Sequence, residues 1–237
     1  MSKLDRTSFV ETYERFSQFY DLVYGKTLQG GREALSRAIR PLPAGDVLEF
    51  GVGSGLMLPL YPSRFRVVGV DVSPGMLARA RWRVQRLGLA NVELHLIDAE
   101  DTGIPDEAFD HVVLPYVYSV TPSPMHLLRE AYRVCRPAGT IWILNHFSGL
   151  GLWDHLERPL KPFARWVGFR PEFPFKTYIT DLDLDIQSVQ AVNWFGLSRL
   201  VRVRRSEALP PGLARKLPGH GAGVAGGRRR PDPALQP

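Results

Sequence analysis

A glycine-rich segment and an acidic residue that follows it are the residues of this sequence best suited to bind a ligand. The segment has the pattern E-x-G-x-G-x-G, formed by Glu49, Gly51, Gly53 and Gly55. Glycines at these spacings let the backbone turn sharply after a strand and approach a ligand closely. Asp71 ends the next apolar run, where its carboxylate can accept hydrogen bonds from both hydroxyls of a ribose. Together these residues predict a nucleoside site.

The spacing of the glycines distinguishes between two nucleoside cofactors. Dinucleotide-binding loops carry G-x-G-x-x-G and hold a pyrophosphate at a helix N-terminus. Here the third glycine comes one residue earlier, which better suits a loop around the amino-acid part of a nucleoside. We therefore expect S-adenosylmethionine rather than NAD. The alternative for Asp71 is a helix N-cap, because VSPGML begins a helix, but Ser73 is the better cap.

Further residues near the ends of the predicted strands are expected to contact the same cofactor. Asp98 follows the third apolar run and can accept a hydrogen bond from an adenine amino group. Ligands of such sheets bind beyond the carboxyl ends of the strands. The remaining expected contacts are Tyr20, Val72, Met76, Ala99 and Tyr116.

Methyl transfer from a sulfonium to an amine requires a neutral nitrogen held in line with the methyl group. An alkylammonium with a pKa near 10 is neutral in only about one molecule per thousand at pH 7, so a base would help. His146 directly follows the fifth apolar run, at the rim where the methyl donor should point, and its ordinary pKa suits proton transfer. The alternative is a hydrogen-bonded structural histidine.

Two tyrosines follow the fourth apolar run, near the expected position of the transferred methyl group. The face of Tyr116 or Tyr118 can hold a methylated ammonium by cation–π attraction of about 0.5 to 2 kcal/mol. Their alternation predicts that one of the two only packs in the core. We favour Tyr116 for the site.

An aromatic and basic segment at residues 150–176 contains candidate ligands for a phosphate. These are Arg165, Arg170 and Lys176, and arginine is best suited to bidentate contact. The alternative for each is a solvated surface charge. With the amphipathic aromatic segment 9–24, this segment would form an interfacial surface for anionic lipid. A lid packed on the domain is the alternative for both segments.

These residues need a sheet that brings strand ends to one edge. Runs rich in Val, Ile and Leu alternate with helical patterns, which predicts a doubly wound, mostly parallel Rossmann-like α/β sheet. Only SRLVRVRRSEAL follows as a further strand, so we expect the seventh strand of such a sheet to be missing or weak. The expected strands are 46–51, 66–72, 92–97, 109–117 and 140–147, and the expected helices are 74–88 and 123–137.

The length suits one α/β catalytic domain with appendages. We place an N-terminal amphipathic helical segment at 1–40 and the domain at 41–209, with a membrane or substrate insertion at 148–180 that forms a lid after strand five. Residues 210–237 are rich in Gly, Pro, Arg and Ala and lack apolar periodicity, which predicts a disordered tail.

Composition argues against several other classes. The formal net charge is +6, but the chain from Glu207 onward carries five basic and two acidic residues, so the body is near balance and no nucleic acid is expected. The single cysteine, Cys135, falls in an apolar helical run where a buried thiol is expected, and the histidines lack metal-ligand spacing. No signal peptide or run of 18 apolar residues occurs. We expect a monomeric, metal-free cytoplasmic protein, peripherally associated with the inner membrane.

Residues 44–147, with the motifs above, resemble the class I S-adenosylmethionine-dependent methyltransferases. Over about residues 13–175 the sequence is similar to the soluble bacterial phosphatidylethanolamine N-methyltransferases, through YDLVYGK, GVGSGLMLPLYP, DVSPGMLARA, LNHF and GFRPEFPF. This resemblance implies stepwise methylation of phosphatidylethanolamine, through its mono- and dimethyl forms, to phosphatidylcholine. The related phosphoethanolamine methyltransferases imply a catalytic pair of Tyr20 and His146, and Tyr24 is a further expected substrate contact.

Three other functions stay open at this point. A methyltransferase could act on a soluble amine, a phenol or a quinone. The chain could instead be a membrane-associated nucleoside-binding protein without catalysis. A nicotinamide oxidoreductase is the remaining alternative, against which the glycine spacing argues.

Overall fold

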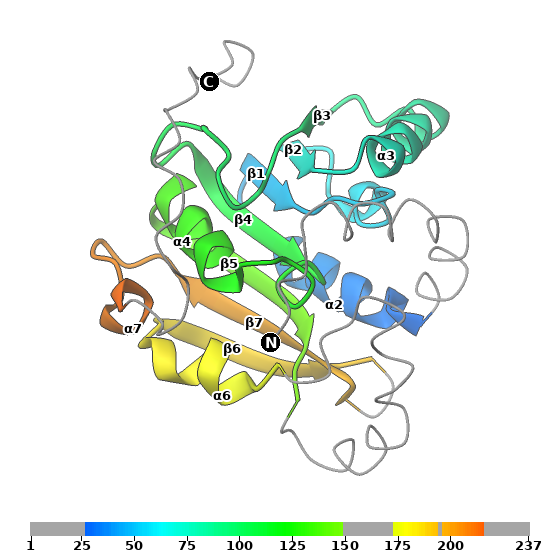
Figure 1. Ribbon diagram of the computed structural model, residues 1–237. Helices are drawn as coiled ribbons and strands as arrows, with labels where there is room; N and C mark the ends of the chain where they lie inside the picture. The colour runs from blue at the N-terminus through cyan, green and yellow to red at the C-terminus, as the bar shows by residue number, and fades with distance from the viewer. Residues whose placement is uncertain (1–26, 149–172, 194–195, 216–237) are drawn as a thin grey trace.

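A computed structural model describes residues 27–148, 173–193 and 196–215 of the chain, and every structural statement below refers to these residues. They form one sheet of seven strands between two layers of helices (Figure 1). The strands are β1 (Gly45–Phe50), β2 (Phe65–Asp71), β3 (Val92–Leu96), β4 (Phe109–Pro115), β5 (Cys135–His146), β6 (Ile186–Val192) and β7 (Ser198–Arg204). The helices are α2 (Gln29–Ile39), α3 (Pro74–Leu87), α4 (Pro124–Val134), α6 (Phe175–Tyr178) and α7 (Pro211–Ala214), with short 3-10 turns η1 (Leu58–Leu60) and η3 (Thr180–Leu182).

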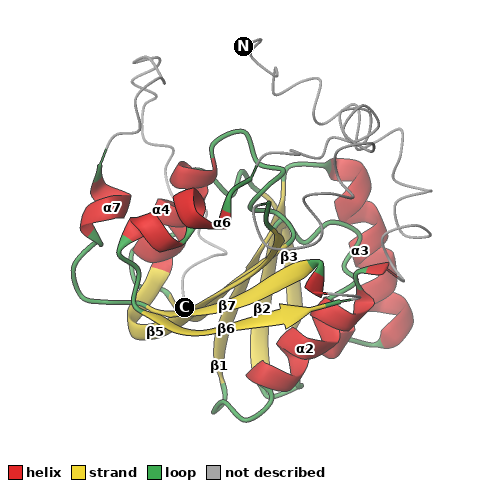
Figure 2. Ribbon diagram, turned by 90° about the horizontal axis from the view of Figure 1, so that it is seen from below, coloured by secondary structure: helices red, strands yellow, loops and turns green. Residues whose placement is uncertain are grey.

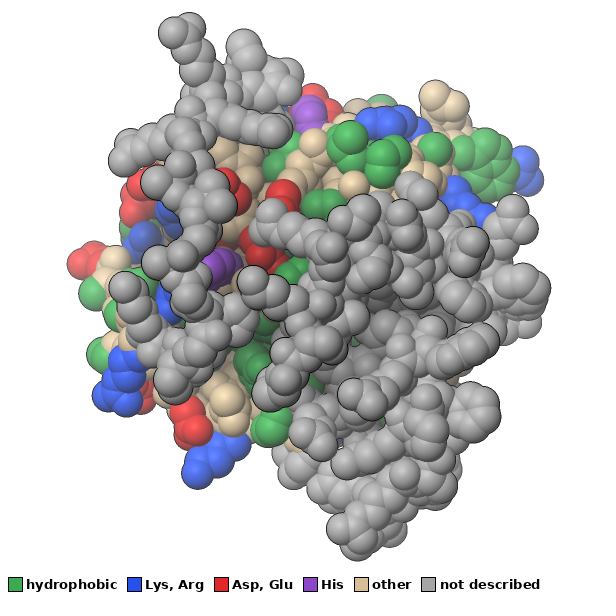
Figure 3. Space-filling view, in the orientation of Figure 1, with side chains coloured by type: hydrophobic (Ala, Val, Ile, Leu, Met, Phe, Trp, Pro, Cys, Tyr) green, Lys and Arg blue, Asp and Glu red, His purple; other side chains and the backbone are tan. Residues whose placement is uncertain are grey.

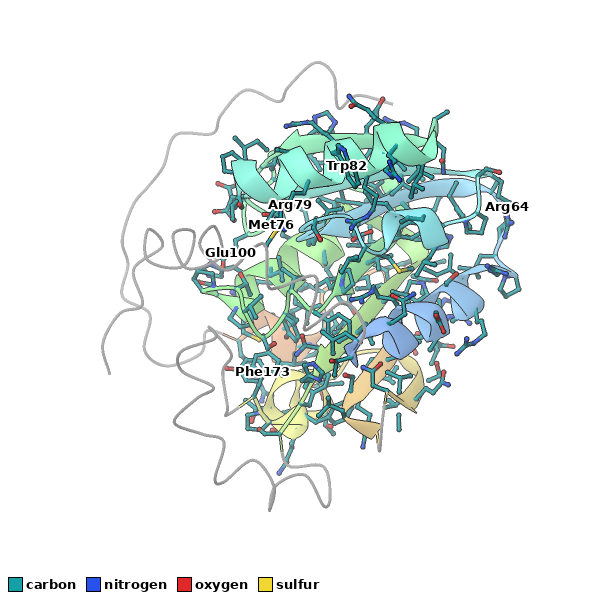
Figure 4. The ribbon with its side chains drawn as sticks, turned by 90° about the vertical axis from the view of Figure 1, so that its right-hand side faces the viewer. Arg64, Met76, Arg79, Trp82, Glu100 and Phe173 are labelled. Atoms are coloured by element: carbon teal, nitrogen blue, oxygen red, sulfur yellow. The ribbon has the colours of Figure 1, made fainter. Side chains whose placement is uncertain are left out.

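The strand order is β3-β2-β1-β4-β5-β7-β6, which confirms the expected Rossmann-like fold class. Strands β1 to β5 pair in parallel, and β7 runs antiparallel to both β5 and β6. The chain leaves β1 toward β2 and β3, then returns to β4 on the other side of β1. Ligands of open α/β sheets bind beside such a reversal, beyond the carboxyl ends of the strands. Figure 4 marks this edge by Glu100, after β3, and the opposite edge by Arg64, before β2.

Helices cover both faces of the sheet and build a hydrophobic core on each. Helices α2 and α3 lie on one face, while α4, α6 and α7 lie on the other (Figure 2). Parallel strands buried on both faces are typically continuous apolar runs, which is why these strands were recognisable in the sequence. Buried side chains of the first core include Leu35, Leu77 and Val113, and those of the second include Leu128, Val201 and Leu213.

Local sequence signals fix both ends of α3. The hydroxyl of Ser73 accepts a hydrogen bond from the backbone N–H of Met76 at 3.2 Å, and Pro74 occupies the first turn. Gly88 ends the helix in the left-handed conformation, at a φ of 63°. Basic and hydrophobic side chains lie side by side on the outer surface of this helix (Figure 3). The exposed Trp82 of this helix is labelled in Figure 4, and its ring lies 5.4 Å from the guanidinium of Arg86.

The prediction of a missing seventh strand is wrong, because residues 186–192 form β6. This strand lies at the edge of the sheet, and its middle five residues are exposed. An edge strand that buries little needs few apolar residues, so IQSVQAV gave no clear signal. The strand that was recognised is β7, which lies between β5 and β6. Its side chains Leu200, Val201 and Val203 are buried in the cores on the two faces of the sheet.

Two further expectations need correction. Cys135 is not helical but begins β5, although it is fully buried as expected, and this burial raises the pKa of its thiol to about 12. Residues 210–215, expected to be disordered, include α7, in which Leu213 is buried. The guanidinium of Arg129 donates to the carbonyl of Leu213 at 2.8 Å and to that of Arg215 at 2.9 Å. A helix of this length is too short to show an apolar periodicity, and the contacts that hold it come from a residue far away in the sequence.

The amphipathic segment 9–24 and most of the insertion fall outside the described residues. The two ends of the insertion meet at Ser148, whose backbone N–H donates to the carbonyl of Phe173 at 3.0 Å. The backbone N–H of Phe173 in turn donates to the hydroxyl of Ser148 at 2.9 Å. The insertion therefore leaves and rejoins the domain at one point beyond β5. No helix in the described ranges is both long and apolar enough to cross a membrane.

Candidate active site

A cavity of about 260 Å³ lies at the carboxyl edge of the sheet, beside the reversal of strand order. Its walls come from the ends of β1 to β4 and from the first turns of α2 and α3. Met76 and Glu100, both labelled in Figure 4, are two of the residues that line it. Of the residues expected to contact a cofactor, the following line this cavity: Glu49, Gly51, Gly53, Asp71, Val72, Met76, Asp98, Ala99 and Tyr116.

The glycine-rich loop is shaped by contacts that exclude side chains. Gly51 has a φ of 65°, and a Cβ there would lie 2.4 Å from a methyl group of Val117. Gly55 does not line the cavity, and its Cβ would lie 2.8 Å from Leu58 and 3.3 Å from the backbone of Ala80 in α3. The first glycine therefore permits the turn toward the cavity, while the third permits close packing of the loop against a helix.

Asp71 connects the glycine-rich loop to the start of α3. One carboxylate oxygen accepts the backbone N–H of Gly53 at 2.8 Å, and the other accepts that of Ser73 at 2.9 Å. Burial raises the pKa of Asp71, and the hydrogen bonds from the backbone act against this rise. Because a carboxylate oxygen can accept more than one hydrogen bond, both oxygens keep capacity for a ligand hydroxyl. The N-cap of α3 is Ser73, so the alternative role for Asp71 is excluded.

A buried carboxyl and a buried guanidinium line the same cavity. Glu49 is 1% exposed, and its Oε2 has no hydrogen-bond partner in the described structure. Burial raises the pKa of Glu49 from an ordinary 4.5 to about 8, although neighbouring Tyr61 and Arg32 act against the rise. Arg32 on α2 is 5% exposed. An acidic and a basic group in one cavity match the two charges of a free amino acid.

Arg32 was missed in the sequence. Its neighbours in QGGREALSRAI form a short amphipathic helix, in which an arginine is ordinarily assigned to the solvent-facing side. The only signal available was its position beside Gly30 and Gly31, before the apolar pair Ala34 and Leu35. That pattern shows a close-packed helix end, but it does not show which cavity the helix borders.

Tyr116 lies where β4 ends and forms one wall of the cavity. Its backbone has a φ of 63°, and its N–H donates to the carbonyl of Leu144 at 2.6 Å. Its hydroxyl donates to the carbonyl of Leu28 at 3.3 Å and accepts from the side-chain amide of Asn193 at 2.9 Å. A Cβ on Gly31 would lie 2.1 Å from this hydroxyl, so α2 can approach only because that residue is glycine.

Tyr118 is corrected from a substrate contact to a core residue. It is fully buried, does not line the cavity, and donates a hydrogen bond to the carbonyl of Tyr178 at 3.1 Å. Its ring packs edge-on against Phe173 at 5.2 Å. Both tyrosines follow the end of β4, and the left-handed φ of 63° at Tyr116 turns the chain between them, so their side chains face different parts of the structure. The prediction that one of the two packs in the core is confirmed, but strand alternation is not the reason, because residues two apart in a strand share a face.

His146 is the last residue of β5, and it does not line the described cavity itself. Its ring lies 5.3 Å from the ring of Tyr116, which does. Burial lowers the pKa of His146, so the ring is neutral at pH 7. Lys176 is exposed on α6 and also lies outside the cavity lining. The predicted site residues Tyr20, Tyr24, Arg165 and Arg170 lie outside the described residues.

Comparisons with known proteins bear on this site. A family model described as a methyltransferase domain matches residues 48–143. A phosphatidylethanolamine N-methyltransferase of Cereibacter sphaeroides is 37% identical over 205 residues, covering 86% of this chain and 99% of the relative. This chain belongs to the class I S-adenosylmethionine-dependent methyltransferases. The expected cofactor is thereby confirmed, and the nicotinamide alternative is wrong.

Two other similar proteins show how widely the methyltransferase domain is shared. A demethylmenaquinone methyltransferase of Listeria welshimeri is 39% identical over 139 residues, which cover 55% of this methyltransferase and 59% of the relative. A solved structure of a Haemonchus contortus phosphoethanolamine N-methyltransferase 2 has a TM-score of 0.58 at 24% identity, and the match covers 68% of this chain and 41% of that one. The latter likeness supports the fold.

The cavity of the methyltransferase fits its cofactor on structural grounds. Gly51 lets the loop turn beside Val117 at the cavity, and the carboxylate of Asp71 presents acceptors that suit ribose hydroxyls. The unpartnered oxygen of Glu49 suits an ammonium group. Among the described residues, no group of three or more acidic, histidine or cysteine side chains could hold a metal ion.

Replacing Glu49 by glutamine measures what this buried carboxyl costs the fold. Between pH 4.5 and about 8 the folded protein keeps a proton that the unfolded chain has released, so stability falls as the pH rises through this window. We therefore expect the free energy of unfolding of Glu49→Gln, relative to that of the wild type, to be roughly 3 kcal/mol higher at pH 8 than at pH 5. Denaturant unfolding at both pH values measures the difference. The exposed Glu33→Gln is the control, and a gain for Glu49→Gln that does not change with pH contradicts the elevated pKa.

Replacing Asp71 by alanine tests the link between the loop and α3. The variant loses the acceptors for Gly53 and Ser73 together with those for a ligand hydroxyl. We expect weaker binding of S-adenosylhomocysteine, by roughly 1 to 3 kcal/mol, in isothermal titration calorimetry. The exposed Asp101→Ala should bind as the wild type does. Unchanged affinity in Asp71→Ala would remove this residue from the site.

Proposed function

We propose that this methyltransferase transfers methyl groups stepwise from S-adenosylmethionine to phosphatidylethanolamine and its mono- and dimethyl forms, giving phosphatidylcholine. The observation that carries the proposal is the match with the Cereibacter sphaeroides enzyme, which extends over 99% of that relative. A match of this extent reaches beyond the cofactor-binding core at residues 48–143, which many methyltransferases share. Substrate specificity lies outside that core, so similarity there supports a shared acceptor.

We assign the ends of the cavity to different parts of the cofactor. Asp71 would accept from the ribose hydroxyls and Asp98 from the adenine amino group, with Val72, Met76 and Ala99 against the base. Glu49 would hold the ammonium of the methionine part and Arg32 its carboxylate, because both are buried ionisable side chains of the lining. Tyr116 would then border the end that carries the methyl group.

Bound S-adenosylmethionine supplies the electrophilic methyl group. The protein's part is to hold the acceptor nitrogen in line with it and to take the proton that leaves the ammonium form. His146 is neutral because of its burial and is packed on Tyr116, so it is suited to receive that proton. Tyr20 is its proposed partner, and the ring of Tyr116 would face the methylated ammonium.

The lipid headgroup would be held by the segments that flank the cavity. Lys176 is exposed on α6, near the point where the insertion rejoins the domain, and it can meet a phosphate. Arg165, Arg170 and Tyr24 complete the proposed contacts. We propose that residues 9–24 and 150–176 bring the enzyme to the anionic cytoplasmic surface of the inner membrane.

A quinone ring is the second candidate acceptor. The demethylmenaquinone methyltransferase of Listeria welshimeri has a slightly higher identity, 39%, but over 139 residues that cover only 59% of that relative. The shorter match favours a shared cofactor site over a shared acceptor site.

Replacing Arg32 by leucine tests the assignment of the methionine carboxylate. We expect binding of S-adenosylhomocysteine to weaken by roughly 1.5 to 3 kcal/mol, as for a lost hydrogen bond to a charged group. Binding of 5′-methylthioadenosine, which lacks the amino-acid part, should not change. Calorimetry with both ligands gives the result, and Arg37→Leu, an exposed position on the same helix, is the matched control. Equal losses for both ligands would place Arg32 elsewhere.

Incubation with methyl-labelled S-adenosylmethionine tests the acceptor. With phosphatidylethanolamine vesicles that contain an anionic lipid, we expect three labelled lipids corresponding to one, two and three methyl transfers. Free phosphoethanolamine and demethylmenaquinone, supplied in parallel, should stay unlabelled. Label in the quinone alone would establish the second candidate, and absence of labelled lipid by an enzyme that binds S-adenosylhomocysteine would refute the first.

A further inference from the structure

A partly buried chain of hydrogen bonds joins His146 to the hydroxyl of Tyr116. The hydroxyl of Ser198, at the start of β7, lies 2.8 Å from Nδ1 of His146. The side-chain nitrogen of Asn193, after β6, lies 2.8 Å from the Ser198 hydroxyl and 2.9 Å from that of Tyr116. Ser198 is fully buried. The two groups proposed to handle the acceptor are therefore connected by side chains of the β6–β7 hairpin.

The direction of this chain is fixed from α2. The backbone N–H of Gly31 points at the side-chain oxygen of Asn193, at 2.5 Å, and an N–H can only donate. The amide nitrogen of Asn193 must then face the two hydroxyls and donate to both. Neither hydroxyl can donate a hydrogen bond to Asn193, because the amide nitrogen that faces them is itself a donor. Tyr116 directs its hydrogen to the carbonyl of Leu28, and the hydrogen of Ser198 can then be donated to Nδ1 of His146, 2.8 Å away.

Nδ1 of His146 has two neighbours of different character. The carbonyl of Leu197, at 3.2 Å, can only accept, whereas the hydroxyl of Ser198, at 2.8 Å, can donate or accept. The shorter distance and the direction set by Asn193 place the donor at Ser198, so that Nδ1 of the neutral ring accepts. When the ring is protonated, Nδ1 can donate to Leu197 without moving. Both protonation states are thus accommodated in one position.

Among the described residues, Tyr116, Arg32 and Arg199 are the titratable or charged side chains that bear on this chain of hydrogen bonds. Tyr116 packs on His146 from β4, and Arg32 on α2 acts electrostatically on Tyr116. Arg199 on β7 directs its guanidinium to the carbonyls of Gly196, at 2.5 Å, and of Ser198, at 3.2 Å. These contacts hold the turn of the hairpin, and none of them gives Nδ1 of His146 another donor.

We propose that Asn193 and Ser198 are positioning residues of this methyltransferase, which hold His146 against Tyr116 and keep the proton of the neutral ring on Nε2. The catalytic consequence rests on the proposed function, but the hydrogen-bond direction does not. Asn193 adopts a left-handed φ of 64°, a conformation that asparagine tolerates better than most residues. Asparagine thus meets both requirements at this position, a side-chain amide for the chain of hydrogen bonds and a left-handed backbone for the turn.

Two substitutions distinguish an effect of hydrogen-bond direction from an effect of side-chain packing. Ser198→Ala removes the hydroxyl donor at Nδ1 and keeps the Leu197 carbonyl, which can only accept, so the ring proton should move to Nδ1. Asn193→Asp preserves the size of the side chain, but its ionised form can only accept, so it should draw the Ser198 hydrogen away and give the same change. Nitrogen-15 spectra of histidine-labelled protein at pH 8 report the tautomer, and loss of one signal in His146→Ala assigns it. Ser188→Ala, an exposed serine on β6, is the matched control.

In the vesicle assay, both variants should lose at least about tenfold in kcat while their affinity for S-adenosylhomocysteine stays within about twofold of the wild type. A wild-type ring that carries its proton on Nδ1 would overturn the proposal. An unchanged tautomer in two correctly folded variants would do the same, and if Ser198→Ala does not fold, Asn193→Asp decides alone. A tautomer change without lipid methylation by the wild type would support the chain and refute the proposed function instead.

Discussion

The position of the Tyr116 hydroxyl is the constraint on which the rest of the site depends. It lies against α2, where only glycine at position 31 leaves room for it, and it hydrogen-bonds to the β6–β7 hairpin through Asn193. These elements come from opposite ends of the described chain. Because α2 also carries Arg32 into the cavity, one contact determines where a buried charge and an aromatic wall lie relative to each other. The fold brings the strand ends together, and this contact sets their spacing.

Much of the cofactor site could be predicted because its chemistry is local in sequence. The glycines act on the backbone where they stand, and Asp71 ends a strand that is recognisable as an apolar run. A parallel strand followed by a helix fixes which edge of the sheet such residues share. Nine of the expected contacts therefore line one cavity, although they are spread from Glu49 to Tyr116. The core role of Tyr118, in contrast, depends on the left-handed turn of the chain at Tyr116, which the apolar pattern does not show.

The residues that escaped prediction act across long distances in the sequence. Arg32 faces a cavity formed by strands that follow it in the chain, and nothing in the helix itself shows this. Asn193 and Ser198 belong to a hairpin whose first strand is an exposed edge without apolar pattern. Their partners lie 77 and 52 residues away in the sequence. Such hydrogen bonds depend on the register of an antiparallel strand. A shift of this register by one residue would turn every side chain of the strand to the other face of the sheet.

Several features of the site are unfavourable for the fold taken alone. Burial of Glu49 without a partner for one oxygen opposes its ionisation, and Tyr116 and Asn193 occupy backbone conformations that most residues avoid. In contrast, the helix ends and core strands follow ordinary rules, as Ser73 and Gly88 show for α3. Buried unpaired groups and strained backbone conformations of this kind are expected at sites that must fit a ligand, even when the rest of the fold follows ordinary rules. The well-packed parallel strands therefore offset the unfavourable free energy of the cavity residues, and the methyltransferase keeps the cavity folded.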